Sequence, residues 1–316
     1  MTSKSYRCAL LATLVLLAAA APAASQVELI EPDLKESPDQ FQELVTLYGQ
    51  GCAVRYGNGA LDRAHWVLRR LELLTTYFNK WSEVPVPTAI FVLDRDLWRR
   101  AGYSTPYGFP LRIGPNIVLA PALGDDLTVR MWKRVLGVET LPMIAGRPVV
   151  GTAEHAATLS LGDVLLQSEA ARGFTQRAGL LGDQAWIGDL MAHVAANVVF
   201  STHETQRMPE IGDMYARMEQ RLGRSGGQLG DYSPLLALGS EEDVRRWLWF
   251  QAKLHNGARI MVEKDGRKAV KRLMQLSRKQ GGELRAALLF DRYPGLRDWA
   301  RSFPVAAPAA SGNAGR

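Results

Sequence analysis

The sequence predicts an α+β fold, with a small mixed sheet in the N-terminal part and a mainly helical C-terminal half. Two short apolar segments, residues 88–93 and 116–121, have the length and composition of buried strands. Apolar residues recur at helical spacing before these segments, and after residue 151 helical patterns follow one another with few breaks. The order of helices, a small sheet and then more helices is typical of an α+β protein.

The composition is that of an ordinary globular protein. The chain has 316 residues, of which 47% are hydrophobic and 22% are charged. This excludes a collagen, a coiled-coil rod and a wholly disordered chain. The length allows one large domain or two medium ones with a buried core. The net charge is +6 and the pI is near 9.4. These values alone do not lead us to predict nucleic-acid binding.

The N-terminus has the pattern of a secretory signal peptide over residues 1–25. Lys4 and Arg7 form the charged start, and residues 10–21 form an apolar run that is short for a membrane span. Small residues follow, and we expect cleavage after Ser25. The protein is therefore predicted to be secreted or periplasmic, with no transmembrane segment after cleavage. Retention of the segment as an N-terminal anchor remains the alternative.

Cleavage would leave Cys52 as the last cysteine, because Cys8 lies inside the signal peptide. An intramolecular disulfide is then impossible, and so is a metal site built from several cysteines. We expect Cys52 to be a small core residue.

Residues 26–150 are predicted to form the N-terminal α+β part. The expected elements are a helix over 33–48, a helix over 61–81, a strand over 88–93, a short helix over 94–101, a loop over 102–110, a strand over 116–121 and an extended piece over 147–150.

Residues 151–303 are predicted to form the helical part of the same domain. The expected helices span residues 153–176, 184–201, 207–222, 240–254, 256–279 and 281–290. The tail, residues 304–316, is rich in Ala, Ser, Gly and Pro and is predicted to be disordered.

The predicted helix that includes residues 163–174 is the one in which we look for a catalytic or metal-binding motif. Zinc peptidases place His-Glu-x-x-His on such a helix, because two His four residues apart face one way and bind the metal while the Glu activates a water molecule. Here the corresponding stretch reads Ser168-Glu169-Ala170-Ala171-Arg172. The next helix begins with Trp186-Ile187-Gly188-Asp189, where a third ligand is found in Trp-x-Asn-Glu sequences.

On these residues the chain resembles the peptidase-MA-like (gluzincin) zinc metallopeptidase family over about residues 60–300. The other stretches that carry the resemblance are Phe91-Val92-Leu93-Asp94, the loop 102–108 and the strand 116–121, which look like the N-terminal half of the family. The resemblance implies a gluzincin-like fold.

The resemblance also implies a degenerate metal site. Ser168 takes the place of the first His, Glu169 keeps the catalytic Glu, Arg172 takes the place of the second His, and Asp189 takes the third ligand position. Serine is a poor zinc ligand, and the permanent positive charge of an arginine repels a cation. We therefore expect no cofactor, no bound metal and no catalytic residue, as in a pseudoenzyme.

Two other interpretations of these helices stay open. Asp189 and His193 are four residues apart on one helical face, and with Glu169 they offer an atypical zinc site in an active metallohydrolase or peptidase. The blander alternatives are a polar contact between helices for Asp189 and His193, and an exposed Glu169–Arg172 pair on a helix surface.

Two further stretches have structural explanations. His203-Glu204 begins a second incomplete His-Glu pattern and is predicted to be a solvated helix end. The basic stretch over residues 267–272 alternates with apolar residues, which indicates the solvated face of an amphipathic helix. An anionic membrane surface or an acidic partner is the alternative for this face.

The function that follows is that of an exported, non-catalytic peptidase-like protein. We expect it to bind a peptide or protein partner in the extracytoplasmic space through a metal-free cleft. The alternatives are the active enzyme with an atypical metal site and a structural helical module of the cell envelope.

Overall fold

The computed structural model describes residues 43–50, 52–80, 89–100, 107–113, 117–122, 133, 153–233 and 240–304. The chain divides into compact units of residues 1–35 and 36–316, and every described residue lies in the second. The predicted signal peptide, the extended piece over 147–150 and the tail beyond Pro304 lie outside the described residues.

A five-stranded mixed sheet forms the N-terminal part. Its strands are β1 (Val45–Gly49), β2 (Cys52–Tyr56), β3 (Ala89–Leu93), β4 (Leu111–Ile113) and β5 (Ile117–Pro121). Their spatial order is β1-β2-β3-β5-β4. The three central strands β2, β3 and β5 are parallel, whereas β1 and β4 pair antiparallel at the two edges. Every residue of β1 is exposed or part-exposed, which suits an edge strand.

Helices make up most of the rest of the described chain. They are α2 (Leu61–Asn79), α3 (Arg95–Arg100), α5 (Ala153–Arg177), α6 (Ala185–His203), α7 (Met208–Leu222), α8 (Glu241–Asp265), α9 (Ala269–Lys279), α10 (Ala286–Arg292) and α11 (Pro294–Arg301). Two very short strands, β6 (Leu181–Gly182) and β7 (Glu283–Leu284), pair parallel and join the start of α6 to the end of α9. The predicted α+β architecture with a helical C-terminal half is confirmed.

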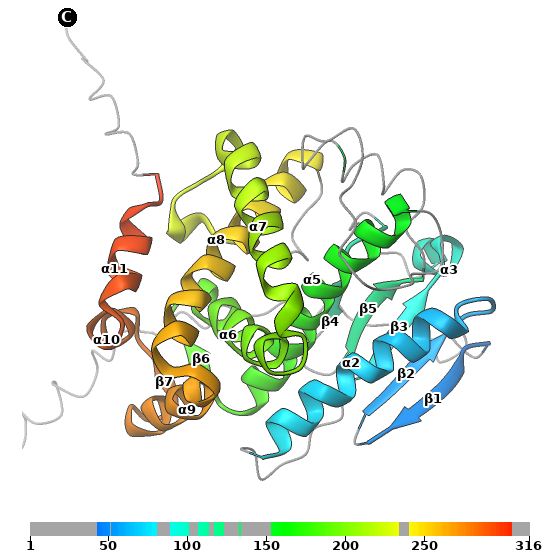
Figure 1. The fold of residues 1–316 in the computed structure, drawn as a ribbon, viewed down its shortest axis with the longest axis horizontal. Helices are drawn as coiled ribbons and strands as arrows, with labels where there is room; N and C mark the ends of the chain where they lie inside the picture. The colour runs from blue at the N-terminus through cyan, green and yellow to red at the C-terminus, as the bar shows by residue number, and fades with distance from the viewer. Residues whose placement is uncertain are drawn as a thin grey trace, which may run out of the picture. The chain divides into compact units, whose positions relative to one another are not determined.

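Two helices cover the sheet and connect it to the helical half (Figure 1). α2 packs on β1 and β2, α5 packs on β4 and β5, and the two helices contact each other. Phe78 of α2 and Phe174 of α5 stack with their ring centroids 4.8 Å apart, and both side chains are buried. Offset aromatic stacking of this kind adds to the burial of apolar area, so it fixes how α2 and α5 meet.

The helical half is built around α6. This helix packs against α5 on one side and α8 on the other, and nearly all of its residues are buried. Its small residues Ala192, Ala195 and Ala196 allow the neighbouring helices to approach closely. α8 begins with a capping box, in which the Ser240 hydroxyl accepts a hydrogen bond from the Asp243 backbone and the Asp243 carboxylate accepts one from the Ser240 backbone.

The predicted strands over 88–93 and 116–121 are confirmed for their described residues. They pair in parallel as β3 and β5, with Ala89 opposite Ile117. The helix that contains Ser168 and Glu169 packs beside this sheet, as the sequence predicted, and most described residues between 153 and 300 are helical. Cys52 is buried in β2, as expected for a core residue.

The predicted helix over 33–48 is wrong for residues 45–48, which belong to β1. Leu44, Val45 and Tyr48 fit helical spacing, but Val45–Gly49 and Cys52–Tyr56 instead form a hairpin in which Val45 pairs with Tyr56. The strands β2 and β4 were not predicted. These residues form a strand in spite of their helical spacing, because they pair with β2. The hydrogen bonds of that pairing cannot be read from the local sequence.

The predicted break between helices at residue 255 is also wrong. α8 runs unbroken from Glu241 to Asp265 and ends at Gly266, whose φ of 56° is the conformation that favours glycine. The last predicted helix, over 281–290, begins instead at Ala286 after a turn through Gly281 and Gly282, and α11 follows it.

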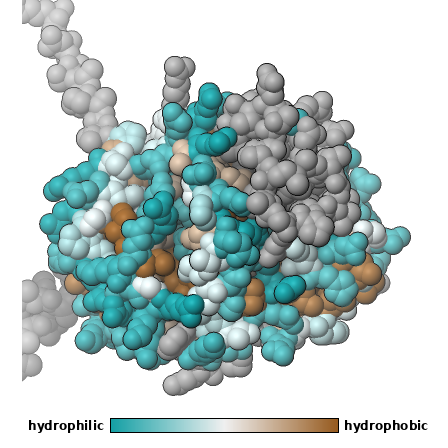
Figure 2. All heavy atoms as spheres, viewed as in Figure 1, coloured by the Kyte–Doolittle hydropathy of each residue, from teal (hydrophilic) through white to brown (hydrophobic). Residues whose placement is uncertain are grey.

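The described surface is mostly hydrophilic in the view of Figure 2, with smaller apolar areas over both the sheet side and the helical half. Val45 is 54% exposed and Tyr48 is 81% exposed on the edge strand β1. Among the described residues, no helix combines the length and apolar character that crossing a bilayer requires.

Candidate functional site

The structure places the four candidate site residues Ser168, Glu169, Arg172 and Asp189 on the neighbouring helices α5 and α6. Ser168 and Glu169 are adjacent on α5, Arg172 lies about one turn further along, and Asp189 lies near the start of α6. All four are buried, with no more than 8% of any residue exposed. The Arg172 guanidinium forms an ion pair with the Asp189 carboxylate. The alternative that Glu169 and Arg172 are a pair on a helix surface is therefore wrong.

A second guanidinium completes the charge balance of this centre. Arg112 of β4 points its Nε toward Glu169 Oε2 at 3.7 Å, and both residues are buried. The centre thus contains two guanidinium groups and two carboxyl groups. Because an unpaired charge in a protein interior costs several kcal/mol, this pairing is what allows the four groups to be buried together. Arg112 was not predicted, since nothing in a three-residue strand distinguishes it from a surface arginine.

Local sequence explains why the guanidinium of Arg172 fits. It lies against Gly188, where an added Cβ would be 3.4 Å from Arg172 Nη2. Ala170 and Ala171 are the small residues that follow Glu169, and both are buried. Small residues on both helices leave room for the long arginine side chain to extend between them.

Burial shifts the pKa values of the charged side chains in this centre. Burial raises the pKa of the Glu169 carboxyl group, although the nearby Arg112 and Arg172 lower it. Burial lowers the pKa of Arg172 to about 9, and the repulsion from Arg112 adds to this, while Glu169 opposes it. The pKa of Asp189 is raised well above its usual value by burial and by the Glu169 carboxylate, while Arg112 opposes the change. The opposite charges oppose this effect of burial but do not cancel it.

Ser168 contacts His193 of α6. Its Oγ lies 3.4 Å from His193 Nδ1 and 3.2 Å from the carbonyl oxygen of Val164. His193 Nε2 donates to Gln251 Oε1 of α8 at 2.8 Å, because an amide oxygen can only accept. A Ser–His contact suggests a nucleophile, but Ser168 is 3% and His193 is 1% exposed, so no substrate reaches this pair in the folded state described here.

A second polar contact repeats this arrangement one turn along. Asn197 Nδ2 donates to the His193 carbonyl oxygen at 2.9 Å and contacts His255 Nδ1 at 3.4 Å. The ring of Tyr215, from α7, stacks on His255 with centroids 4.1 Å apart. His255, assigned to a helix boundary by the sequence, is a buried residue in the middle of α8. The signal that could have found this contact is the matched spacing of four between His193 and Asn197 and between Gln251 and His255.

The structure does not assemble the alternative metal site of Glu169, Asp189 and His193. Asp189 is engaged by Arg172, and His193 is engaged by Ser168 and Gln251. Within the described part of the chain, no three His, Cys, Asp or Glu side chains are arranged to hold a metal ion. What Asp189 and His193 do make are polar contacts between helices, as the blander prediction stated.

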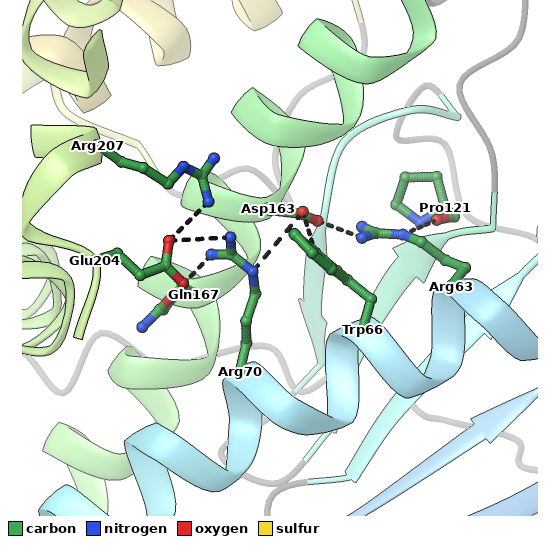
Figure 3. Close-up of polar contacts among 8 residues, drawn as sticks. All are labelled: Arg63, Trp66, Arg70, Pro121, Asp163, Gln167, Glu204 and Arg207. Carbon is green, nitrogen blue, oxygen red and sulfur yellow. Dashed lines mark hydrogen bonds and ion pairs between the residues drawn. The ribbon is translucent and has the colours of Figure 1, made fainter. Parts of the chain in front are cut away.

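A separate buried network joins α2, α5 and the end of β5 (Figure 3). Asp163 of α5 forms an ion pair with Arg63 of α2 and accepts a hydrogen bond from the Trp66 indole. The Arg63 Nε donates to the carbonyl oxygen of Pro121 at 3.5 Å. Asp163 is 2% exposed, so its charge is compensated from within the protein.

The network continues from α2 to the end of α6 (Figure 3). Arg70 contacts Gln167 Oε1 and Glu204 Oε2, each at 3.3 Å, and Arg207 Nη1 lies 2.7 Å from the same Glu204 oxygen. The prediction of a solvated helix end at His203-Glu204 is thus wrong for Glu204, which is 5% exposed. The missed signal was Arg207, placed three residues after the carboxylate.

An open hollow of about 380 Å³ lies elsewhere, at the carboxyl ends of the parallel strands β2, β3 and β5. Its described lining residues are Asn58, Gly59, Ala60, Asp94, Arg95, Tyr107 and Ala122. The Arg95 guanidinium stands over the Tyr107 ring at 6.0 Å, and the Tyr107 hydroxyl donates to the Leu93 carbonyl oxygen at 3.3 Å. The carboxyl edge of parallel strands is a common position for ligand sites, and this volume is in the usual range.

Comparisons with known proteins leave the family open. No family model matches the chain, and no curated protein matches it. The geometry described above is therefore what any functional proposal has to rest on.

The Arg172–Asp189 pair is expected to behave as a buried ion pair. Replacing Asp189 by Leu leaves the guanidinium uncompensated and should lower the free energy of unfolding by about 3–5 kcal/mol. Replacing both residues, as Arg172→Met with Asp189→Leu, should recover most of that loss. Urea unfolding at neutral pH measures both variants.

The exposed pair Arg259–Glu263, which lies on the surface of α8 at 3.2 Å, provides the control. Glu263→Leu should change the free energy of unfolding by about 1 kcal/mol or less, because solvent screens exposed pairs. If the Arg172/Asp189 double variant is as unstable as Asp189→Leu alone, the pair does not account for the stability of this centre.

Stability is expected to depend on the protonation of His193. Burial lowers its pKa to about 4, although its contact with Gln251 opposes this, so the unfolded chain, with a pKa of about 6.5, binds the proton more readily. The resulting stability is present at neutral pH and is lost as the pH falls through the interval between these values. Relative to His193→Gln, the wild type should lose about 2 kcal/mol of unfolding free energy between about pH 7.5 and pH 4.5. Urea titrations at both pH values measure this difference, and His203→Gln, at an exposed position, should follow the wild type.

Proposed function

We propose that this protein is an exported, non-catalytic member of the peptidase-MA-like (gluzincin) group that binds a peptide or protein partner. The observation that carries the proposal is the Arg172–Asp189 ion pair. Two positions that hold zinc ligands in that group are here bonded to each other, with Glu169 balanced by Arg112 beside them. A metal ion at this place would compete with a permanent cation for the same carboxylate.

The order of elements supports the same assignment. A small mixed sheet precedes the helix that carries Ser168, Glu169 and Arg172, that helix packs on the sheet, and the next helix delivers Asp189. Glu169 without a metal-bound water has nothing to activate in a zinc-peptidase mechanism. The proposed role is therefore binding, with the former site acting as a structural centre.

The proposed binding site is not at the positions that correspond to the zinc site, which are Ser168, Glu169, Arg172 and Asp189. The four side chains at those positions are buried, so a partner would not touch them, whereas the carboxyl-edge hollow is open. Asp94 and Arg95 supply an anion and a cation there, and Tyr107 supplies a ring. These are groups that recognise the backbone and mixed side chains of a short extended peptide. Export, with cleavage after Ser25, remains part of the proposal.

The alternatives predict different observations. An active enzyme with zinc at Glu169, Asp189 and His193 would have to break the Arg172–Asp189 and His193–Gln251 contacts to free the ligands. A purely structural module of the cell envelope would have no use for the open hollow.

Rebuilding the metal ligands tests the family assignment. The combined variant Ser168→His, Arg172→His and Asp189→Glu, with Glu169 retained, should hold about one zinc per chain, because three ligands then converge. Elemental analysis after incubation with zinc and desalting measures the content. The single variant Ser168→His should not retain zinc, and the wild type should hold no stoichiometric zinc and cleave no casein.

Two results would contradict this part of the proposal. A folded triple variant, by circular dichroism, without zinc would show that these positions are not the metal-site positions of the family. Stoichiometric zinc in the wild type that disappears in Asp189→Ala or His193→Ala would favour the atypical enzyme.

Peptide binding at the hollow is tested on an array of random-sequence peptides probed with purified protein. The spots bound by the wild type should be lost with Arg95→Ala and kept with Arg99→Ala, which removes an exposed arginine from the same helix. Equal binding by both variants, or no spots above background, would remove the hollow as the peptide site.

A further inference from the structure

A stripe of cations runs along α9 and the short 3-10 helix that precedes it. The members of this α9 stripe are exposed residues: Arg267, Lys268, Lys271, Arg278 and Lys279. They recur at spacings of three or four residues, with the exposed Gln275 filling the gap, and so they share one face of the helix. From Lys268 to Lys279 the face is about 17 Å long at the rise of an α-helix.

The segment that carries the stripe is locally rich in positive charge. Residues 266–282 contain six Lys and Arg and no Asp or Glu, whereas the other residues contain 32 Lys and Arg and 32 Asp and Glu. The sixth cation, Arg272, is paired with the buried Asp265 and is not part of the stripe.

The opposite face of α9 packs into the core. Val270, Leu273 and Met274 are buried, so the helix has no apolar face to insert into a bilayer while the protein stays folded. Residues 266–282 contain no aromatic residue, so the stripe has no ring on which nucleic-acid bases would stack. What α9 presents to solvent is mainly positive charge.

An exposed apolar residue lies at one end of the stripe. Leu181 of β6 is 51% exposed and pairs with Glu283 of β7, which follows α9. The Ser277 hydroxyl donates to the Gly179 carbonyl oxygen at 2.9 Å, which holds this loop against the last turns of α9. Glu283, which is exposed, marks the end of the acid-free segment.

We propose that the α9 stripe docks the protein on an anionic phospholipid surface. A protein partner would need a groove or a buried apolar anchor for affinity, and α9 exposes no large apolar side chain. A lipid headgroup layer presents many phosphates in a plane, which a straight row of flexible lysines and arginines contacts without a groove. The inference does not depend on the proposed peptidase-like function.

Vesicle sedimentation with the full chain tests the proposal. The wild type should bind vesicles of equimolar phosphatidylcholine and phosphatidylglycerol, and not vesicles of phosphatidylcholine alone. The stripe variant Lys268→Gln, Lys271→Gln, Arg278→Gln and Lys279→Gln should bind at least about a hundredfold more weakly. Raising the ionic strength to about 1 M, where the Debye length is about 3 Å, should release the wild type.

The matched control removes the same charge from other elements. Arg99→Gln, Arg217→Gln, Arg221→Gln and Arg246→Gln change exposed residues of α3, α7 and α8 and should leave binding within about threefold of the wild type, because each surface cation contributes only where it approaches the phosphates. All variants share the wild-type N-terminus, so any contribution of residues 1–25 is common to them. Circular dichroism verifies that each variant is folded.

Four outcomes would overturn the proposal. They are absence of binding to the anionic vesicles, equal loss of binding in the stripe and control variants, equal binding to neutral vesicles, and stripe-dependent binding to soluble polyglutamate that is as tight as binding to vesicles. The last result would assign the stripe to an acidic polypeptide.

Discussion

The neutralisation of buried charge on α5 is the constraint on which the rest of this structure depends. The helix carries Asp163, Glu169 and Arg172 into the interior. Their charged partners lie on three different elements: Arg63 on α2, Arg112 on β4 and Asp189 on α6. Since a buried ion without its partner costs several kcal/mol, α5 packs stably only when all three elements are in place. One helix therefore couples the sheet to the helical half.

The coarse fold was predictable because its strongest signals are local. The strands over 88–93 and 116–121 are uninterrupted apolar runs, and these are typical of central parallel strands buried on both faces. Edge strands lack that signal: Val45–Gly49 is half exposed, and its apolar residues fit helical spacing equally well. The continuity of α8 through His255 was also hidden, since a polar pair such as His255-Asn256 interrupts an amphipathic pattern but not a helix whose polar side chains find partners on α6 and α7.

At the candidate site, sequence spacing placed the residues on α5 and α6 but could not identify all of their partners. Ser168, Glu169 and Arg172 follow from a helical pattern with a known motif, and Asp189 follows from the next helix. Arg112 is 57 residues from Glu169 and Gln251 is 58 residues from His193, so only the tertiary structure brings these pairs into contact. Helical periodicity indicates which residues share a face, but it does not indicate which other element covers that face.

Charged groups are balanced in the interior of this protein, whereas cations are in excess on one part of its surface. In the centre around Arg172, two guanidinium groups meet two carboxyl groups, so it contributes nothing to the net charge. The α9 segment carries six Lys and Arg and no Asp or Glu, and most of these side chains are exposed to solvent, where charge is inexpensive. The carboxyl-edge hollow belongs to β2, β3 and β5, whereas the α9 stripe belongs to an element packed on α6 and α8. No residue is common to both, so occupation of the hollow by a peptide leaves every cation of the stripe available to an anionic surface.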